Sequence, residues 1–250
     1  MRRARSYHVR AIAVRSRPLG EADAIVTLFS AERGKLDVAA RGVRRPSSRL
    51  AAAAEPGVEA EWSLHRGSSL EVASAAKIVR EYWDRMRDPD RLIASAAALA
   101  TVDALCEPEL AVPDLYDALC GALAAIAAAE DPFVYLPRWY MRALALLGLA
   151  PPADACVQCG GALGEGSAWL DASAGGLVCA RCRPAWSDLP ELTAREIAEF
   201  AGLAAPSGAG ARVRVGSAVA ASARALVLHH AGRQVPAIAN APVSPAEHRR

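Results

Sequence analysis

Four cysteines in the second half of the chain have the spacing of a metal site. Cys156 and Cys159 form one C-x2-C pair, and Cys179 and Cys182 form a second pair further along the chain. Two such pairs can direct four thiolates toward one point, the ligand set of a tetrahedral Zn²⁺ site with Zn–S distances of about 2.3 Å. The spacing therefore predicts one zinc ion per chain.

The number of ligands indicates what this metal would do. Catalytic zinc keeps three protein ligands and one position for water or substrate, whereas four cysteine ligands close the coordination shell. The predicted zinc is therefore structural. Two other interpretations of the cysteines stay open, namely a pair of disulfides and a thiol redox site of the C-x-x-C kind.

The first residues bear on that choice. Met1-Arg2-Arg3 is followed by polar Ser6, Tyr7 and His8 rather than by an apolar stretch, so we expect no secretory signal peptide. A reducing compartment keeps cysteines as thiols, which disfavours the disulfides. No uncharged apolar run reaches the ~18 residues of a membrane span, so we expect a cytoplasmic protein without a membrane partner.

Charge is distributed unevenly along the chain. Residues 1–80 contain 15 Lys and Arg against 8 Asp and Glu, a net charge of +7, whereas residues 81–250 contain 14 against 19, a net charge of −5. A local basic excess is the electrostatic signature of a surface that meets a polyanion. The N-terminal part is therefore expected to have a polyanionic partner.

The segment 41–49 is the sharpest candidate for that contact, with four arginines among Gly, Pro and Ser residues. Arginine binds phosphate oxygens bidentately, and neutralising several phosphates releases counterions, so affinity falls with salt. A solvated basic loop without a nucleic-acid partner is the alternative interpretation. The candidate DNA-binding residues are Arg10, Lys35, Arg41, Arg44, Arg45 and Arg49.

The elements that must position this segment have the pattern of a small β-barrel, with short apolar runs between turn residues. The Ala-rich segment 47–54 predicts a helix, ended by Glu55-Pro56-Gly57. Five strands with a helix after the third is the order of an OB-fold, a common host of single-stranded nucleic acid. The predicted strands are 8–17, 25–30, 36–40, 58–65 and 70–78.

Aromatic residues are few in this part. Tyr7, Phe29 and Trp62 fit core positions better than base-stacking platforms, because Phe29 and Trp62 share strand faces with apolar neighbours. We therefore expect contact with nucleic acid through charge rather than through base stacking.

After residue 80 the pattern becomes helical. Asp88-Pro89 and Asp131-Pro132 each place an acidic N-cap before a proline, and helices are expected from there toward Leu105 and Leu147. Further helices are predicted from Pro113 to Ala129, from a capping box at Thr193 to Leu203, and over 217–230.

The predicted fold class is an α+β multidomain protein. An N-terminal five-stranded OB-fold β-barrel is followed by an all-α helical domain that carries the four-cysteine zinc module. The expected boundaries are 1–80 for the barrel, 81–153 and 185–235 for the helical domain, 154–184 for the zinc module and 236–250 for a frayed C-terminal tail.

A second basic feature lies on the helix after Asp131. Arg138 and Arg142 are four residues apart and share a helix face, beside Trp139 and Tyr140. One interpretation is a basic notch beside aromatic surface, which suits an acidic peptide with an apolar terminus. The other is an ordinary polar face of an amphipathic helix.

Signatures of catalysis are missing from the sequence. It contains no phosphate-binding G-x-x-x-x-G-K-[ST], no G-x-S-x-G, no H-E-x-x-H and no dinucleotide-binding G-x-G-x-x-G after a strand. We therefore expect a protein that is not an enzyme, while a hydrolase with an unusual site stays open.

The order of these parts resembles the RecO family of bacterial recombination mediators and DNA repair proteins. The resemblance covers nearly the whole chain and rests on the combination of modest motifs. They are Gly20-Glu21-Ala22-Asp23, Thr27-Leu28-Phe29, Gly34-Lys35, residues 40–45 with Ser48-Arg49, Leu146-Leu147-Gly148-Leu149-Ala150-Pro151, and the two cysteine pairs at 156–160 and 175–182.

The resemblance implies a non-enzymatic protein that binds single- and double-stranded DNA, anneals complementary strands and assists recombinase loading onto strands coated by single-strand-binding protein. It also implies RecR and the acidic tail of single-strand-binding protein as partners, Arg138 and Arg142 as tail contacts, and a place with the nucleoid. A zinc-stabilised adaptor that binds only proteins is the alternative from another functional class.

Overall fold

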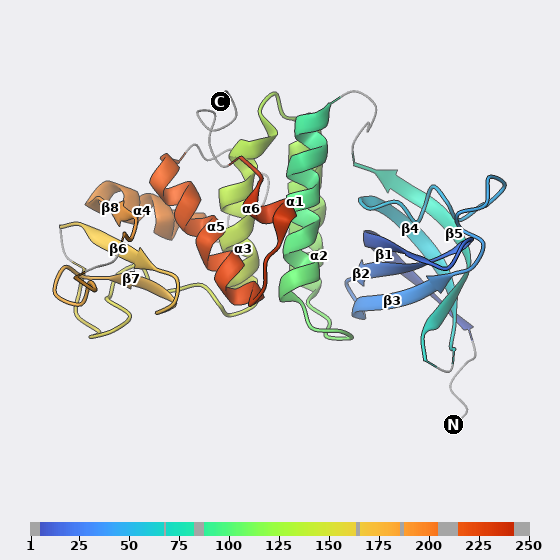
Figure 1. The fold of residues 1–250 in the computed structure, drawn as a ribbon, viewed down its shortest axis with the longest axis horizontal. Helices are drawn as coiled ribbons and strands as arrows, with labels where there is room; N and C mark the ends of the chain where they lie inside the picture. Colours follow the sequence, from blue (N-terminus) through green and yellow to red (C-terminus); the bar gives the residue numbers. More distant parts are fainter. Residues whose placement is uncertain are drawn as a thin grey trace.

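A β-barrel and a helical region lie next to each other along the longest axis of the molecule (Figure 1). The computed structural model describes residues 6–67, 69–82, 88–163, 166–185, 188–204 and 215–242. A small three-stranded sheet lies at the end of the helical region that is remote from the barrel. The expected α+β fold class is confirmed.

The barrel closes through five strands. Neighbours pair in the order β1-β2-β3-β5-β4, and β4 returns to pair with β1. All pairings are antiparallel except the short parallel contact between β3 and β5. The five predicted strands are confirmed, with bounds β1 Ser6–Leu19, β2 Asp23–Ser30, β3 Gly34–Ala40, β4 Val58–His65 and β5 Glu71–Glu81.

Strand β1 contributes to two hydrophobic cores. Ala11 and Ala13 are buried inside the barrel, whereas Ile12 and Val14, which point to the other face of the strand, belong to the core of the helical region. Phe29 of β2 also joins the helical core and packs against Tyr116, with ring centroids 6.1 Å apart. The barrel and the helical region therefore share buried surface.

The connection between β3 and β4 contains no helix, so the helix predicted over 47–54 is wrong. The segment forms successive turns, with the amide of Ala54 donating to the carbonyl of Leu50 at 3.0 Å. Leu50, Ala53 and Ala54 are buried in the barrel core. Eight residues are too few to hold a helix by propensity alone, and packing against the barrel decides their conformation.

The helical region is held by local signals that the sequence carries. Asp88 caps α1 by accepting from the amides of Asp90 and Arg91, and Thr193 and Glu196 form the predicted capping box of α4. None of the helices among the described residues is long and apolar enough to span a membrane. The helices are α1 Pro89–Leu105, α2 Pro113–Ala128, α3 Leu136–Leu146, α4 Ala194–Leu203, α5 Ser217–Ala231 and α6 Pro236–Ala239, with a 3-10 turn, η1, over Pro132–Tyr135 before α3.

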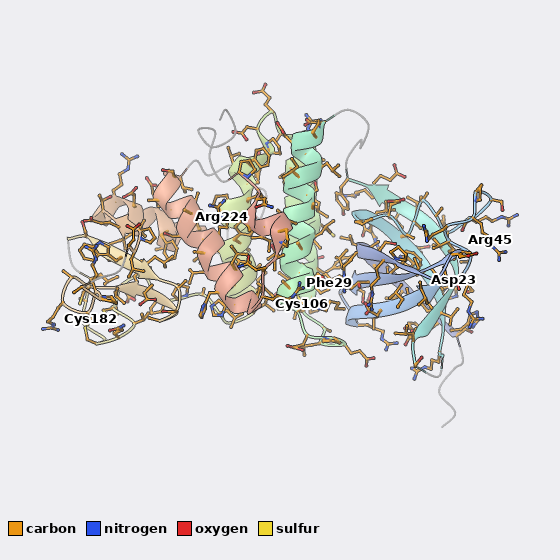
Figure 2. The ribbon with its side chains drawn as sticks, in the orientation of Figure 1. Asp23, Phe29, Arg45, Cys106, Cys182 and Arg224 are labelled. Atoms are coloured by element: carbon orange, nitrogen blue, oxygen red, sulfur yellow. The ribbon has the colours of Figure 1, made fainter. Side chains whose placement is uncertain are left out.

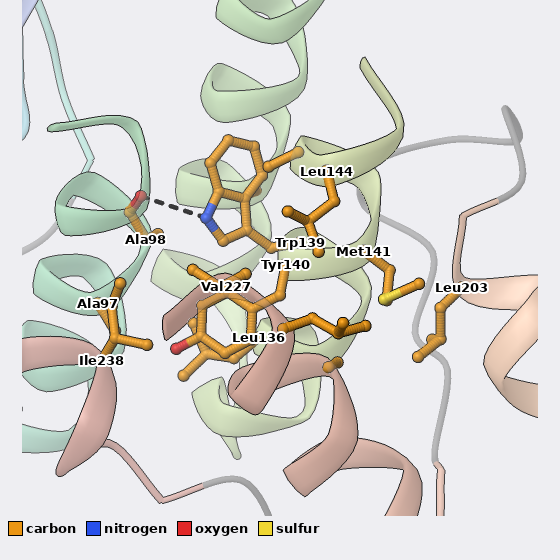
Figure 3. Close-up of a cluster of buried hydrophobic side chains, with 14 of the residues drawn as sticks. Ala97, Ala98, Leu136, Trp139, Tyr140, Met141, Leu144, Leu203, Val227 and Ile238 are labelled. Carbon is orange, nitrogen blue, oxygen red and sulfur yellow. Dashed lines mark hydrogen bonds between the residues drawn. The ribbon is translucent and has the colours of Figure 1, made fainter. Parts of the chain in front are cut away.

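Helix α3 lies at the centre of the helical core (Figure 3). Trp139 and Tyr140 are almost completely buried, and the indole N–H of Trp139 donates to the carbonyl of Ala98 at 3.2 Å. The aromatic surface expected beside Arg138 is therefore wrong, because these rings fill the core between α1, α3 and α5.

Two expected boundaries differ from the structure. The small sheet contains β6 Ala168–Asp171 and β7 Gly176–Val178, but also β8 Glu191–Leu192, so the cysteine module continues past residue 184. The C-terminal tail expected from residue 236 begins with helix α6, where Ile238 is fully buried. Burial of this side chain fixes a segment whose local sequence suggested fraying, and residues 243–250 lie outside the described part.

Candidate nucleic-acid interface and metal centre

The arginine loop, which we define as residues 41–49, leaves the barrel after β3 and lies at its outer end. The side chains of its four arginines, Arg41, Arg44, Arg45 and Arg49, are exposed. Figure 2 shows Arg45 at one end of the long axis and Cys182 at the other. The loop and the cysteine module are therefore separate sites.

The loop is an ordered structure. Val43 and Leu50 are buried in the barrel core on either side of Arg44 and Arg45. The amide of Arg45 donates to the carbonyl of Gly42 at 3.1 Å, and the amide of Ser48 donates to the carbonyl of Arg45 at 3.0 Å. These turns and buried anchors hold the arginines in a defined arrangement.

The charges of the loop differ from those of four other arginines of the barrel. Arg10, Arg15, Arg17 and Arg33 each form an ion pair, with Glu59 at 2.7 Å, Asp103 at 3.2 Å, Asp37 at 3.1 Å and Glu71 at 3.6 Å, respectively. None of the ion pairs between described residues involves an arginine of the loop. The positive charges of the loop are thus available to an external anion.

Two depressions of the surface border the loop. One of about 480 Å³ is lined by Arg44, Arg45 and Pro46 together with residues of β1 and of the segment 51–56 that precedes β4. The other, of about 440 Å³, is lined by Arg41 and Asp23 together with residues of the β4–β5 connection. Both depressions therefore have arginines of the loop on their walls.

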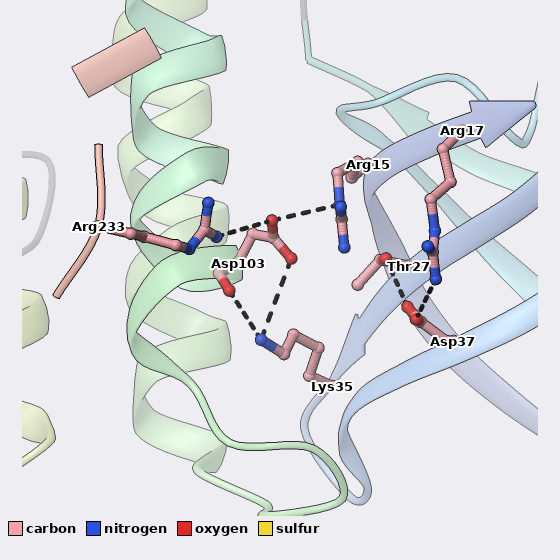
Figure 4. A network of polar contacts seen from close by, with 7 residues as sticks. All are labelled: Arg15, Arg17, Thr27, Lys35, Asp37, Asp103 and Arg233. Atoms are coloured by element: carbon pink, nitrogen blue, oxygen red, sulfur yellow. Dashed lines mark hydrogen bonds and ion pairs between the residues drawn. The ribbon is translucent and has the colours of Figure 1, made fainter. Parts of the chain in front are cut away.

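Arg10 and Lys35 contact residues of the junction between the barrel and the helical region rather than residues of the arginine loop. Arg10 pairs with the buried carboxylate of Glu59, which also accepts from the hydroxyls of Tyr116 at 2.8 Å and Tyr82 at 3.0 Å. Lys35 donates from Nζ to the main-chain carbonyl of Asp103 at 2.7 Å (Figure 4). Both cations stabilise the junction between barrel and helices.

Arg138 and Arg142 occupy unequal environments on α3. Arg138 is only 3% exposed and its Nη1 lies 3.5 Å from the carbonyl of Gly202 at the end of α4, whereas Arg142 is half-buried. Burial and then the charge of Arg142 lower the pKa of the Arg138 guanidinium. Of the two, Arg142 is the more accessible to a partner.

The four cysteines predicted as ligands converge. Their sulfur atoms all lie within 4.8 Å of one another, and the Sγ atoms of Cys159 and Cys179 are 3.9 Å apart. Tetrahedral thiolates around zinc are separated by about 3.8 Å, since each lies about 2.3 Å from the metal. A disulfide would require about 2.05 Å, so the cysteines are thiols and the disulfide interpretation is wrong.

The chemistry of the cluster fits a bound cation. Burial tends to raise the pKa of Cys156, but backbone N–H donors of Cys179, Cys159 and Gln158 outweigh it and hold that pKa at about 6. The side chain of Cys159 raises the pKa of Cys182 to about 12. A negative charge on one sulfur thus makes ionisation of a second sulfur less favourable. A metal ion bound between the sulfur atoms would favour ionisation of all four thiols.

Three carboxylates with defined roles were missed by sequence reasoning. Glu59 and Asp103 hold the junction, and Asp23 accepts from the amide of Gly42 at 2.7 Å. Glu59 sits at a position of β4 between buried Val58 and Ala60. Glu61 alternates with apolar residues in the same way and is exposed, so no local signal separates the buried acid from the exposed one.

Comparison with known proteins agrees with this arrangement of parts. A family model described as "Recombination protein O N terminal" matches residues 1–82, and one described as "Recombination protein O C terminal" matches residues 86–231. The chain belongs to the RecO family. The two matches meet between the end of the barrel and the start of α1, where the structure passes from strands to helices.

A curated relative supports the same assignment. The "DNA repair protein RecO" of a Nocardioides species is 34% identical over 188 residues, which cover 74% of this chain and 77% of the relative. Membership of the RecO family gives the chain a role in DNA repair and recombination.

Proposed function

We propose that this RecO-family protein is a recombination mediator that binds single- and double-stranded DNA through the arginine loop. The observation that carries the proposal is the set of four exposed arginines that take part in no ion pair between described residues. Such charges gain most from phosphate, because no intramolecular carboxylate has to be displaced.

Strand annealing follows from the same chemistry. Two complementary strands repel each other through their phosphates, and arginines that neutralise one backbone lower this repulsion as the second strand approaches. The aromatic residues of the barrel support this electrostatic mode over base stacking, since Phe29 and Trp62 are fully buried.

Zinc is the metal that we propose for the cysteine cluster. Four thiolates with tetrahedral spacing are the ligand set of structural zinc, and they leave no position for substrate. Cys156, Cys159, Cys179 and Cys182 would hold the ion and join the loops on both sides of β6 and β7. The proposal gives this ion no part in catalysis.

Recruitment to coated single strands is proposed to use a second surface. The resemblance that identified the acidic tail of single-strand-binding protein as a partner points to Arg138 and Arg142, and Arg142 is the accessible member of the pair. RecR is a further proposed partner. Together, these contacts would place the protein where a recombinase is loaded.

The test is a titration of a short single-stranded oligonucleotide at several salt concentrations. Arg45→Ala should weaken binding about tenfold at low salt, the equivalent of one charge-assisted hydrogen bond of roughly 1.5 kcal/mol. The dependence of log affinity on log salt should become shallower by about 0.7 for each phosphate that the variant no longer neutralises.

Arg195→Ala is the matched control for that titration. It removes the same charge from α4, at the other end of the molecule, where the side chain is 89% exposed. It should leave affinity unchanged. Equal losses for the two variants would show a nonspecific charge effect, and a wild type without DNA binding at low salt would favour the protein-only adaptor.

A further inference from the structure

The turn between β1 and β2 holds the arginine loop at three points. The carboxylate Oδ1 of Asp23 accepts from the amide of Gly42 at 2.7 Å, the carbonyl of Ala22 accepts from the amide of Arg44 at 2.9 Å, and the carbonyl of Gly20 accepts from Nη1 of Arg44 at 3.2 Å. Of these three acceptors, only the one from Asp23 belongs to a side chain, and the other two are main-chain carbonyls.

We propose that Asp23 is a positioning residue for DNA binding, acting through the backbone of the arginine loop. This inference rests on the proposed function of the loop. The carboxylate of Asp23 holds the amide of Gly42 and thereby the turn that carries Arg44 and Arg45, and it does not contact the DNA itself.

The position of an acid at this place needs an explanation. Asp23 and Arg41 line the same depression beside the loop, so the carboxylate repels any phosphate that enters it. Among the described residues, Asp23 forms no ion pair with an arginine of the loop that would cancel this cost. Its carboxylate accepts a hydrogen bond from the main-chain amide of Gly42, so the charge stabilises the backbone of the loop.

The backbone at Gly42 shows why such a tether is useful. Gly42 adopts a left-handed conformation with φ of +64°, which lets the chain reverse directly after β3. Arg44 and Arg45 follow within the next three residues. Fixing the backbone before DNA arrives lowers the entropic cost of binding, because only the arginine side chains then have to be ordered.

Positioning and simple electrostatics predict opposite results for Asp23→Ala. Removing a negative charge beside a phosphate site should tighten binding if charge alone matters. If the carboxylate positions the loop, the same change should weaken binding about three- to tenfold, the range expected for one hydrogen bond. Asp23→Asn keeps an oxygen acceptor and removes the charge, so it should bind at least as well as the wild type.

Glu21→Ala is the matched control. Glu21 lies in the same turn, carries the same charge and is exposed, and among the described residues it has no hydrogen bond or ion pair. Its removal should leave affinity unchanged or raise it slightly. Gly42→Ala is an independent second variant, because it disfavours the left-handed backbone without altering charge.

The experiment measures oligonucleotide affinity and amide hydrogen exchange in the full chain. Asp23→Ala and Gly42→Ala should bind more weakly and exchange faster at the amides of the arginine loop, while the amides of β2 and β4 stay protected. Asp23→Asn should restore both properties. Slow loop exchange in Asp23→Ala, or binding as tight as that of Glu21→Ala, would overturn the proposal.

The two readouts separate this inference from the proposed function. If no variant and no wild type binds DNA, the proposed function fails, while faster loop exchange in Asp23→Ala and its restoration in Asp23→Asn would still establish the tether. If the wild type binds and Asp23→Ala binds equally well, only the positioning role fails.

Discussion

Glu59 joins the barrel to the helical region through one buried carboxylate. It lies on β4 with 1% of its surface exposed, and it accepts from Arg10 of β1, Tyr82 after β5 and Tyr116 of α2. A buried charge is tolerated when it is paired and hydrogen-bonded. Loss of this one acid would leave donors from three segments without their acceptor.

The ionisation of Glu59 links folding to pH. Burial acts to raise its pKa, but hydrogen bonds from Arg10, Tyr116 and Tyr82 outweigh burial and lower the pKa below 4.5 in the folded state. A carboxylate with a depressed pKa contributes stability above its unfolded pKa and loses that contribution as pH falls through the folded value. The contribution is therefore complete near neutral pH and declines below about pH 4.5.

Glu59→Gln should lower the free energy of unfolding by about 2 kcal/mol at pH 7, less than for a fully buried ion pair, because Arg10 is half exposed. Urea denaturation at pH 7 and at pH 4 measures both effects, and the variant should lose less stability on acidification than the wild type. Glu61→Gln is the control, because Glu61 is exposed on the same strand. An equal acid response in wild type and Glu59→Gln would refute the linkage.

The cysteine module combines three short strands with the four-cysteine cluster. Its strands are two to four residues long, and the cysteines lie in the loops before β6 and after β7. Leu170, Leu177 and Leu192 are buried in the core of the helical region, but strands this short are marginal alone. Four bonds to one ion would hold these loops together, so binding energy becomes folding energy for this module.

Removal of the metal should therefore unfold the module and spare the barrel. A chelator, or Cys159→Ser, should reduce bound zinc, measured by elemental analysis, and change the fluorescence of Trp169 on β6. Oligonucleotide affinity should stay within about twofold, because the arginine loop lies at the opposite end of the molecule.

Cys120→Ser is the matched control for that prediction, since Cys120 lies on α2 outside the cluster. It should keep the full metal content. Loss of DNA binding in parallel with loss of zinc would instead assign the module a direct part in nucleic-acid contact.

At the scale of the whole molecule, Asp103 ties three segments together (Figure 4). The carboxylate near the end of α1 lies 3.2 Å from Arg15 of β1, 4.0 Å from Lys35 of β3 and 3.6 Å from Arg233 after α5. Together with the shared core, these contacts hold the barrel against the helices through residues that are far apart in the sequence.

Asp103→Asn should weaken that docking by about 1–2 kcal/mol, less than a fully buried pair, because Arg15 and Arg233 are half exposed. Hydrogen exchange should rise on both sides of the junction. Asp37→Asn removes a carboxylate that pairs within the barrel, with Arg17 and Thr27, and its effect should stay in the barrel. Identical exchange patterns for the two variants would contradict a special role of Asp103.

The helices and strands that could be predicted from the sequence are those with local signals. The caps at Asp88 and Thr193 determine helix starts through contacts within a few residues, and the apolar runs of the barrel mark its strands. The helix prediction for the segment 47–54 failed because the Ala-rich composition favours a helix, whereas burial of Leu50 against the barrel favours turns. Ile238 shows the reverse case, in which distant packing orders a segment with weak local signals.

Residue types and their spacing alone identified the four cysteines of the cluster, the five strands of the barrel and the basic character of the segment 41–49, because each is a property of the chain read in order. Which of the basic residues are paired with acids is visible only in the folded chain. Arg10 and Lys35 pair with acids that lie 49 and 68 residues away, whereas the arginine loop meets no such partner among the described residues. Ion pairing is a matter of distance in space, and the chain fold alone sets that distance.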